Sequence, residues 1–141
     1  MLKGILIAIF VGSGYLFTTP SQPQAKQKPD ALKESLKRGE QVYITNCQSC
    51  HMAQGEGIPG AFPPLAKSDY LLKDQKRAIS SVVYGVSGEI TVNGATYMMD
   101  MPAQSHLSDQ EVADVLNYIQ NNWGNKAKPV TPAQVKAERK K

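Results

Sequence analysis

Apolar residues recur at the spacing of amphipathic helices in several segments of the chain, and polar or glycine-containing stretches separate these segments. A first helix is predicted from near Asp30, a possible N-cap, up to Cys47, with apolar positions at Leu32, Leu36, Val42, Tyr43 and Ile44. A second helix is predicted from about Asp74 to Tyr84, with its apolar face at Ile79, Val82 and Val83. Gly85 follows it as a C-terminal stop.

The segment that follows Leu107 carries the clearest helix signals. Ser108 and Glu111 have the spacing of a capping box, and Leu107 and Val112 can pack outside it as a hydrophobic staple. The apolar face of this third predicted helix continues until Gly124, through Val112, Val115, Leu116, Ile119 and Trp123.

Two shorter elements complete the pattern. Residues from Glu89 to Tyr97 alternate around Asn93-Gly94, which is the signal of a hairpin with a type I′ turn. The run Thr131-Pro132-Ala133-Gln134 is a capping box with proline at the first helical position, so a fourth, short helix is predicted after it. The fold class is therefore mainly α, with one small β-hairpin.

The N-terminus has the features of an export signal. Met1-Leu2-Lys3 precedes an apolar run from Gly4 to Phe17, which as a helix would span about 21 Å, short of the roughly 30 Å hydrocarbon core. Cleavage near Thr19-Pro20-Ser21 is favoured, and an uncleaved anchor stays open. We assign residues 1–21 to a signal peptide or N-terminal anchor, 22–34 to a linker that runs into the first helix, 35–125 to one domain, and 126–141 to a basic C-terminal tail.

The net charge of +4 is unevenly distributed along the chain. Residues 31–124 hold seven basic against ten acidic side chains, a net of minus three. The segment after Gly124 holds six basic residues and only Glu138 opposite them. It lacks the interleaved aromatic residues of single-strand nucleic-acid binding. The tail either docks an acidic partner or an anionic lipid surface, or it is a solvated tail.

The stretch Cys47-Gln48-Ser49-Cys50-His51 has the C-x-x-C-H pattern of covalent haem attachment. Each thiol can add to one vinyl group of a porphyrin to form a thioether, and two intervening residues let both sulfurs reach the same ring. His51 then lies where it can bind the iron as the proximal ligand. One covalent haem c would also supply much of the core that a small domain lacks.

The two cysteines are also compatible with two other chemistries. A zinc site would need two more ligands, and the chain offers no other cysteine and only one other histidine, His106. A thioredoxin-like dithiol belongs beside a βαβ pattern, which is missing around residue 47. Haem attachment is the favoured interpretation.

Beyond this motif, the chain from Leu36 to Asn125 resembles the class I cytochrome c family. The resemblance is carried by residues on both sides of the motif: Gly39, Tyr43, Phe62-Pro63-Pro64-Leu65, Met101-Pro102-Ala103, Val115 and Tyr118. It implies the cytochrome c fold, in which helices pack around one covalent haem. The hairpin at Asn93-Gly94 is similar to that of periplasmic single-haem cytochromes that are fused to or serve dehydrogenases and nitrite reductases.

The resemblance also implies roles for individual residues. The first and last helices of the family cross closely at a glycine and an aromatic, which gives packing roles to Gly39, Tyr43, Val115 and Tyr118. A proline carbonyl accepts the second ring proton of the proximal histidine, and Pro63 matches that position best, with Pro64 as the neighbouring alternative. The chain departs from the family at Gln104, where an aromatic residue often follows Met-Pro-Ala.

The sixth iron ligand decides between electron transfer and haem catalysis. Met101 is the candidate because it precedes Pro102 in the family pattern, and its thioether would favour ferrous iron and raise the haem potential. Met98 and Met99 compete with it, and His106 would give bis-histidine coordination.

A few other side chains have two possible roles each. Tyr70, Tyr97 and Trp123 either line the haem crevice or pack in the core. Lys76 and Arg77 either pair with haem propionates or form a solvated helix start.

These features predict a one-electron carrier, and not an enzyme, working between redox enzymes outside the cytoplasm. Its partners would be redox proteins such as a dehydrogenase, a reductase or a terminal oxidase, with possible membrane association through the N-terminus. We expect it in the periplasm or anchored to the inner membrane facing the periplasm. The alternatives are a permanently bound electron-transfer subunit of a larger oxidoreductase, and a haem enzyme or sensor with an open sixth site.

Overall fold

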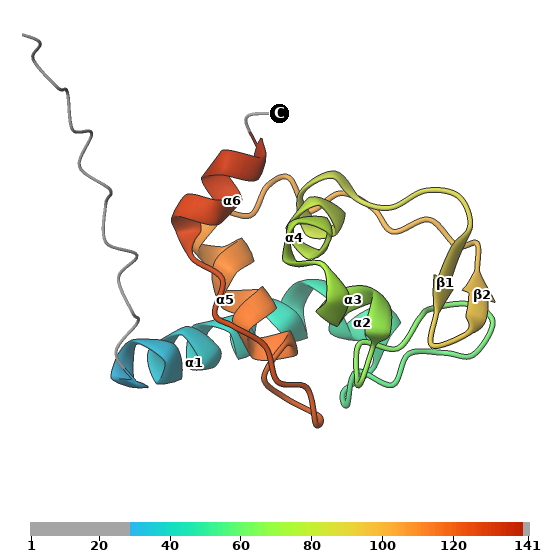
Figure 1. Cartoon of the computed structure of the whole chain (residues 1–141), viewed down its shortest axis with the longest axis horizontal. Helices are drawn as coiled ribbons and strands as arrows, with labels where there is room; N and C mark the ends of the chain where they lie inside the picture. The colour runs from blue at the N-terminus through green and yellow to red at the C-terminus, as the bar shows by residue number, and fades with distance from the viewer. Residues whose placement is uncertain (1–28, 140–141) are drawn as a thin grey trace, which may run out of the picture.

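The computed structural model describes residues 29–139. Within this range the chain forms a mainly helical domain with one two-stranded antiparallel sheet (Figure 1). The elements in chain order are α1 (Pro29–Asn46), α2 (Gln48–His51), α3 (Asp69–Lys73), α4 (Gln75–Tyr84), β1 (Ile90–Val92), β2 (Ala95–Tyr97), α5 (Asp109–Ile119) and α6 (Pro132–Arg139).

Residues 1–28 and 140–141 lie outside the described part of the chain, and with them the predicted signal peptide or anchor, Lys140 and Lys141. Among residues 29–139, no helix combines the length and apolarity needed to cross a membrane. The linker predicted over 22–34 differs from the structure at its end. Residues 29–34 belong to α1, because the helix begins at Pro29.

The closest packing in the domain is the crossing of α1 over α5, and Gly39 allows it. A Cβ on Gly39 would collide with the backbone carbonyl of Asp114 and come within 2.9 Å of the Tyr118 Cβ. One turn further along α1, the rings of Tyr43 and Tyr118 have centroids 5.5 Å apart. The implied packing roles of these residues therefore match the observed crossing of the two helices, which fixes the end of α1 that leads into the C-x-x-C-H motif.

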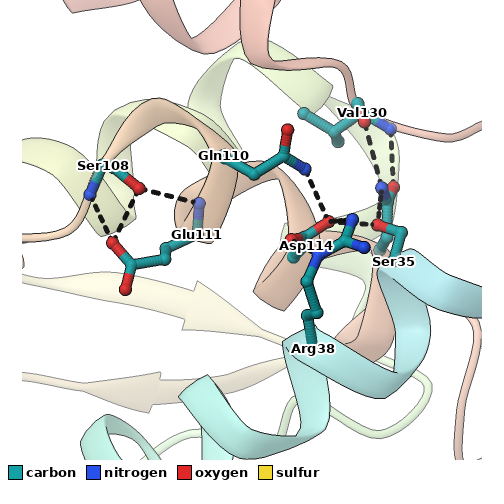
Figure 2. A network of polar contacts seen from close by, with 8 residues as sticks. Ser35, Arg38, Ser108, Gln110, Glu111, Asp114 and Val130 are labelled. Carbon is teal, nitrogen blue, oxygen red and sulfur yellow. Dashed lines mark hydrogen bonds and ion pairs between the residues drawn. The ribbon is translucent and has the colours of Figure 1, made fainter.

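A buried carboxylate ties the same two helices together (Figure 2). Asp114 of α5 is almost inaccessible to solvent and accepts hydrogen bonds from Ser35 Oγ at 2.6 Å and Gln110 Nε2 at 2.9 Å. The guanidinium of Arg38 pairs with both of its oxygens, at 2.6 and 2.9 Å. A buried carboxylate is costly unless its oxygens are satisfied, so this set of donors is what permits Asp114 at the crossing.

The chain after Gly124 packs onto the domain, which differs from the separate basic tail predicted over 126–141. Val130 and Val135 are fully buried in the same core as α4 and α5. The Asn117 side chain of α5 makes two hydrogen bonds to the Val130 backbone, accepting from its N–H at 2.7 Å and donating to its carbonyl at 3.0 Å. Arg139 forms an ion pair with Asp109 at 2.7 Å, so its charge is paired with a residue of the same domain.

In α5 and α6 the helix termini predicted from local side-chain signals are confirmed with one exception. The capping box of Ser108 and Glu111 is present at the start of α5, and Thr131 and Gln134 make the equivalent bonds at the start of α6. The exception is the end of α5, which comes at Ile119 instead of near Gly124. Trp123 has a φ of +53° and has left the helix to pack against Tyr43, with ring centroids 5.0 Å apart.

The predicted hairpin is confirmed, with Ile90 paired to Tyr97 and Val92 paired to Ala95. Asn93 and Gly94 have φ values of +50° and +81°, as a type I′ turn requires. The turn is held against the start of α3 by Asp69, whose carboxylate accepts from the Asn93 N–H at 2.8 Å while its own N–H donates to Asn93 Oδ1 at 3.0 Å. The hairpin is thereby fixed on the side of the domain away from α6 (Figure 1).

Candidate functional site

The C-x-x-C-H motif forms one helical turn directly after α1. The N–H of Cys47 donates to the Tyr43 carbonyl at 2.9 Å, and the N–H of His51 donates to the Cys47 carbonyl at 3.0 Å. Tyr43 also donates its hydroxyl to the Met52 carbonyl at 2.6 Å, where the chain turns away. The turn therefore brings Cys47, Cys50 and His51 to one wall of a single cavity.

His51 is buried, with 7% of its surface exposed, and its ring is oriented by a backbone carbonyl. Its Nδ1 lies 2.9 Å from the carbonyl oxygen of Pro63, the position that the family resemblance implied. Burial lowers the pKa of His51, and the Pro63 hydrogen bond offsets this in part. A neutral imidazole that donates from Nδ1 keeps the lone pair of Nε2 for a metal, which is the state that an iron ligand would need.

The cavity next to the motif is large and mainly apolar. It encloses about 960 Å³ when its open mouth is included. Its walls come from α3, α4, the hairpin and α5, with apolar side chains at Leu65, Leu71, Val82, Val86, Ile90, Val92, Leu116 and Ile119. The apolar character of these walls fits a flat apolar macrocycle such as haem.

Met101 lies on the same cavity, in the loop between β2 and α5. Met99 also contributes to the wall but is 57% exposed, and Met98, which is 70% exposed, does not line the cavity. His106 is exposed and lies outside the lining, with its Nε2 3.2 Å from Asn46 Oδ1. All five predicted site residues, Cys47, Cys50, His51, Pro63 and Met101, are therefore brought together around one space.

The structure also shows where several residues lie for which the sequence left two roles open. Tyr70 lines the cavity, whereas Trp123 packs against Tyr43 and Tyr118. Arg77 lies outside the lining and stacks on Tyr70, its guanidinium carbon 4.1 Å from the ring centroid. The apolar wall supplied by the hairpin was not anticipated, although the alternation of Ile90 and Val92 was a signal for a buried face.

The two competing chemistries of the cysteines find no support in this geometry. Within residues 29–139, no group of three or more histidine, cysteine or acidic side chains is placed to hold a metal ion, as a zinc site would need. Burial, followed by the neighbouring Cys50, raises the pKa of the Cys47 thiol to about 11. Redox-active dithiols have lowered thiol pKa values, and the raised pKa of Cys47 differs from that pattern.

A helical domain built around a cavity of this kind, with the motif on its wall, defines a c-type cytochrome, and comparison with known proteins agrees. The sequence pattern described as Cytochrome c matches residues 36–123, so the chain belongs to the cytochrome c family. It is 39% identical over 125 residues to cytochrome c-552 of Thermus thermophilus, covering 73% of this chain and 95% of that protein.

Two larger proteins contain a similar segment. The cytochrome c subunit of the quinone alcohol dehydrogenase of Gluconobacter oxydans is 35% identical over 123 residues, which is 80% of this chain and 26% of that subunit. The cytochrome c subunit of the gluconate 2-dehydrogenase of Pantoea cypripedii is 35% identical over 100 residues, which is 68% of this chain and 22% of that subunit. The protein is an electron-transfer cytochrome with covalent haem c, and Cys47, Cys50 and His51 fit the C-x-x-C-H pattern of haem attachment.

Proposed function

We propose that the protein carries single electrons through a six-coordinate haem, with His51 and Met101 as the axial ligands and thioethers at Cys47 and Cys50. The observation that carries this proposal is that all four side chains line one apolar cavity. The haem supplies a one-electron iron couple when bound. His51 and Met101 would hold the iron, and the apolar walls would exclude water from the faces of the ring.

Each proposed residue has a physical task. The Pro63 carbonyl accepts from His51 Nδ1 and so fixes the ring and raises the basicity of its other nitrogen. The soft sulfur of Met101 favours the ferrous state and raises the potential. Because a filled sixth position leaves no site for oxygen or peroxide, these residues support electron transfer over haem catalysis.

The partners we propose are redox enzymes outside the cytoplasm: a dehydrogenase, a reductase or a terminal oxidase. The export-type N-terminus supports a location in the periplasm or on the outer face of the inner membrane. A free shuttle is supported by the similarity to cytochrome c-552 over nearly its full length. A permanently bound subunit is the second candidate, supported by the similar segments in the two dehydrogenase subunits.

Covalent attachment through both thiols is tested by mass spectrometry of the exported protein. The intact mass should exceed that of the processed polypeptide by one haem, because Cys47 and Cys50 are the only cysteines in the chain. Denaturing acid extraction should leave the haem on the protein. Release of the haem into the organic phase, or zinc in place of iron, would contradict the proposal.

Charge around the C-terminal segment is expected to affect the rate of encounter with a partner. Truncation at Asn125 would remove the buried Val130 and Val135, so the test uses a double variant of exposed lysines, Lys128→Gln with Lys136→Gln. We expect a several-fold slower oxidation by membranes of the producing cells at low salt, with an unchanged spectrum. The deficit should disappear toward about 1 M salt, where the Debye length is about 3 Å.

The matched control for this charge test is Lys33→Gln with Lys37→Gln on α1, which removes the same charge from another exposed surface. Equal rates of the two double variants at every salt concentration would show that only net charge matters. Wild-type rates in the Lys128 and Lys136 variant would place the docking surface elsewhere.

A further inference from the structure

The backbone of Met101 is paired with a segment that follows α4. The N–H of Met101 donates to the Val86 carbonyl at 2.8 Å, and the N–H of Val86 donates to the Met101 carbonyl at 3.0 Å. The two residues form an isolated antiparallel bridge, separate from the hairpin. Both also line the cavity, so this bridge holds one cavity wall to another.

Gly85 packs directly against the backbone of the loop that contains Met101. A Cβ at this position would collide with the Met101 carbonyl oxygen, and it would lie 2.8 Å from the Ala103 nitrogen and 3.2 Å from the Pro102 carbonyl carbon. Gly85 also has a φ of +78°, a conformation that other residues adopt only with strain. The loop can therefore approach the end of α4 this closely only because residue 85 has no side chain.

The loop that contains Met101 lies partly at the surface. Pro102 and Ala103 are exposed, and Met101 is only partly buried. Hydrogen bonds also restrain the loop: the Gln104 N–H donates to the Val82 carbonyl at 2.9 Å, and its side-chain amide donates to the Pro102 carbonyl at 3.1 Å. The location of Met101 therefore depends on the close approach of the loop to Gly85 and on its backbone hydrogen bonds to Val86.

We propose that Gly85 is a positioning residue for Met101, acting together with the backbone of Val86. The absence of a Cβ at residue 85 lets the Met101 backbone approach the end of α4, and the two Val86 hydrogen bonds hold it there. This inference rests on the proposed role of Met101 as the sixth ligand. It adds that residue 85, which does not line the haem cavity, would affect how firmly Met101 holds the iron.

The test compares Gly85→Ala with Gly88→Ala in the haem-loaded protein. Gly88 has a φ of +81°, close to that of Gly85, but a Cβ there would meet nothing within 4 Å. The two variants therefore share the backbone strain, and only Gly85→Ala pushes on Met101. In Gly85→Ala we expect a weakened red absorption band of ferric haem with sulfur bound, a lower potential, and imidazole binding to ferric haem tighter by about tenfold or more.

Three outcomes separate this inference from the proposed function. Retention of the red band in Met101→Ala would overturn Met101 as ligand, and the inference with it. Loss of the band in Met101→Ala, with Gly85→Ala and Gly88→Ala identical in spectrum, potential and imidazole affinity, would overturn only the role of Gly85. Changes confined to Gly85→Ala would support both.

A measurement on the unaltered protein covers the case in which Gly85→Ala does not accumulate in folded form. The amide hydrogens of Met101 and Val86, which donate across the bridge, should exchange much more slowly than that of the exposed Ala103. Exchange of all three at similar rates would mean that the bridge is open in solution, and the inference would fail.

Discussion

Replacing Met101 by alanine is expected to abolish the weak red absorption band of the ferric protein and to open the sixth position to added ligands. The potential should fall on the order of 0.1 V, a fraction of the roughly 0.8 V over which axial ligands set haem potentials. The reason is that a thioether favours ferrous iron, and water or hydroxide in its place does not. Visible spectroscopy and a redox titration measure both effects.

The neighbouring methionines are the matched controls for this substitution. Met98→Ala should leave the spectrum and the potential unchanged, because Met98 is exposed and lies outside the cavity wall. Met99→Ala tests the nearest competitor, since Met99 shares the cavity wall but is largely exposed. If Met101→Ala keeps the red band and Met99→Ala loses it, the ligand is Met99 and the proposed assignment is wrong.

Removing both thiols, as Cys47→Ala with Cys50→Ala, is expected to leave a largely unfolded chain. The cavity walls and the hydrophobic core share several side chains: Leu71, Ala78, Val82, Leu116 and Ile119. Without haem these side chains would face water or a void, and a domain of this size buries too little other apolar surface to compensate. Circular dichroism should show reduced helicity and no cooperative thermal transition.

The control for the thiol variant is Ser49→Ala, which changes an exposed residue inside the same motif and leaves both cysteines in place. It should load haem and unfold cooperatively like the unaltered protein. A cooperative thermal transition in the haem-free double variant would contradict the dependence of the fold on its cofactor.

Signals that lie within a few residues of one another predicted most of the elements correctly. The two capping boxes, at Ser108 and Thr131, mark the starts of α5 and α6, and Asn93-Gly94 marks the hairpin turn. Each works through a hydrogen bond or a backbone conformation available to the local chain. The end of α5 is different, because Trp123 leaves the helical path to pack against Tyr43, which is distant in sequence.

For the C-terminal segment, composition alone led to a wrong prediction of its packing. Its basic residues indicated a solvated or docking tail, but Val130 and Val135 are fully buried. The decisive contacts join Asn117 to Val130, and Ser35 of α1 to Asn117 at 2.9 Å. Charge at exposed positions of a helix is compatible with a buried opposite face, so a run of lysines does not by itself separate a tail from a packed segment.

The sequence by itself favoured haem attachment, because the two thiols and the histidine of the C-x-x-C-H pattern lie close enough together to act on one ring. Pro63 and Met101 entered only through the family resemblance, since nothing local relates them to His51. Only the tertiary structure places the Pro63 carbonyl oxygen 2.9 Å from His51 Nδ1. It also places the Met101 backbone against Gly85 and Val86. The physical reason is that these contacts join segments far apart in the chain, and such contacts depend on how the helices pack and not on the propensities of either segment.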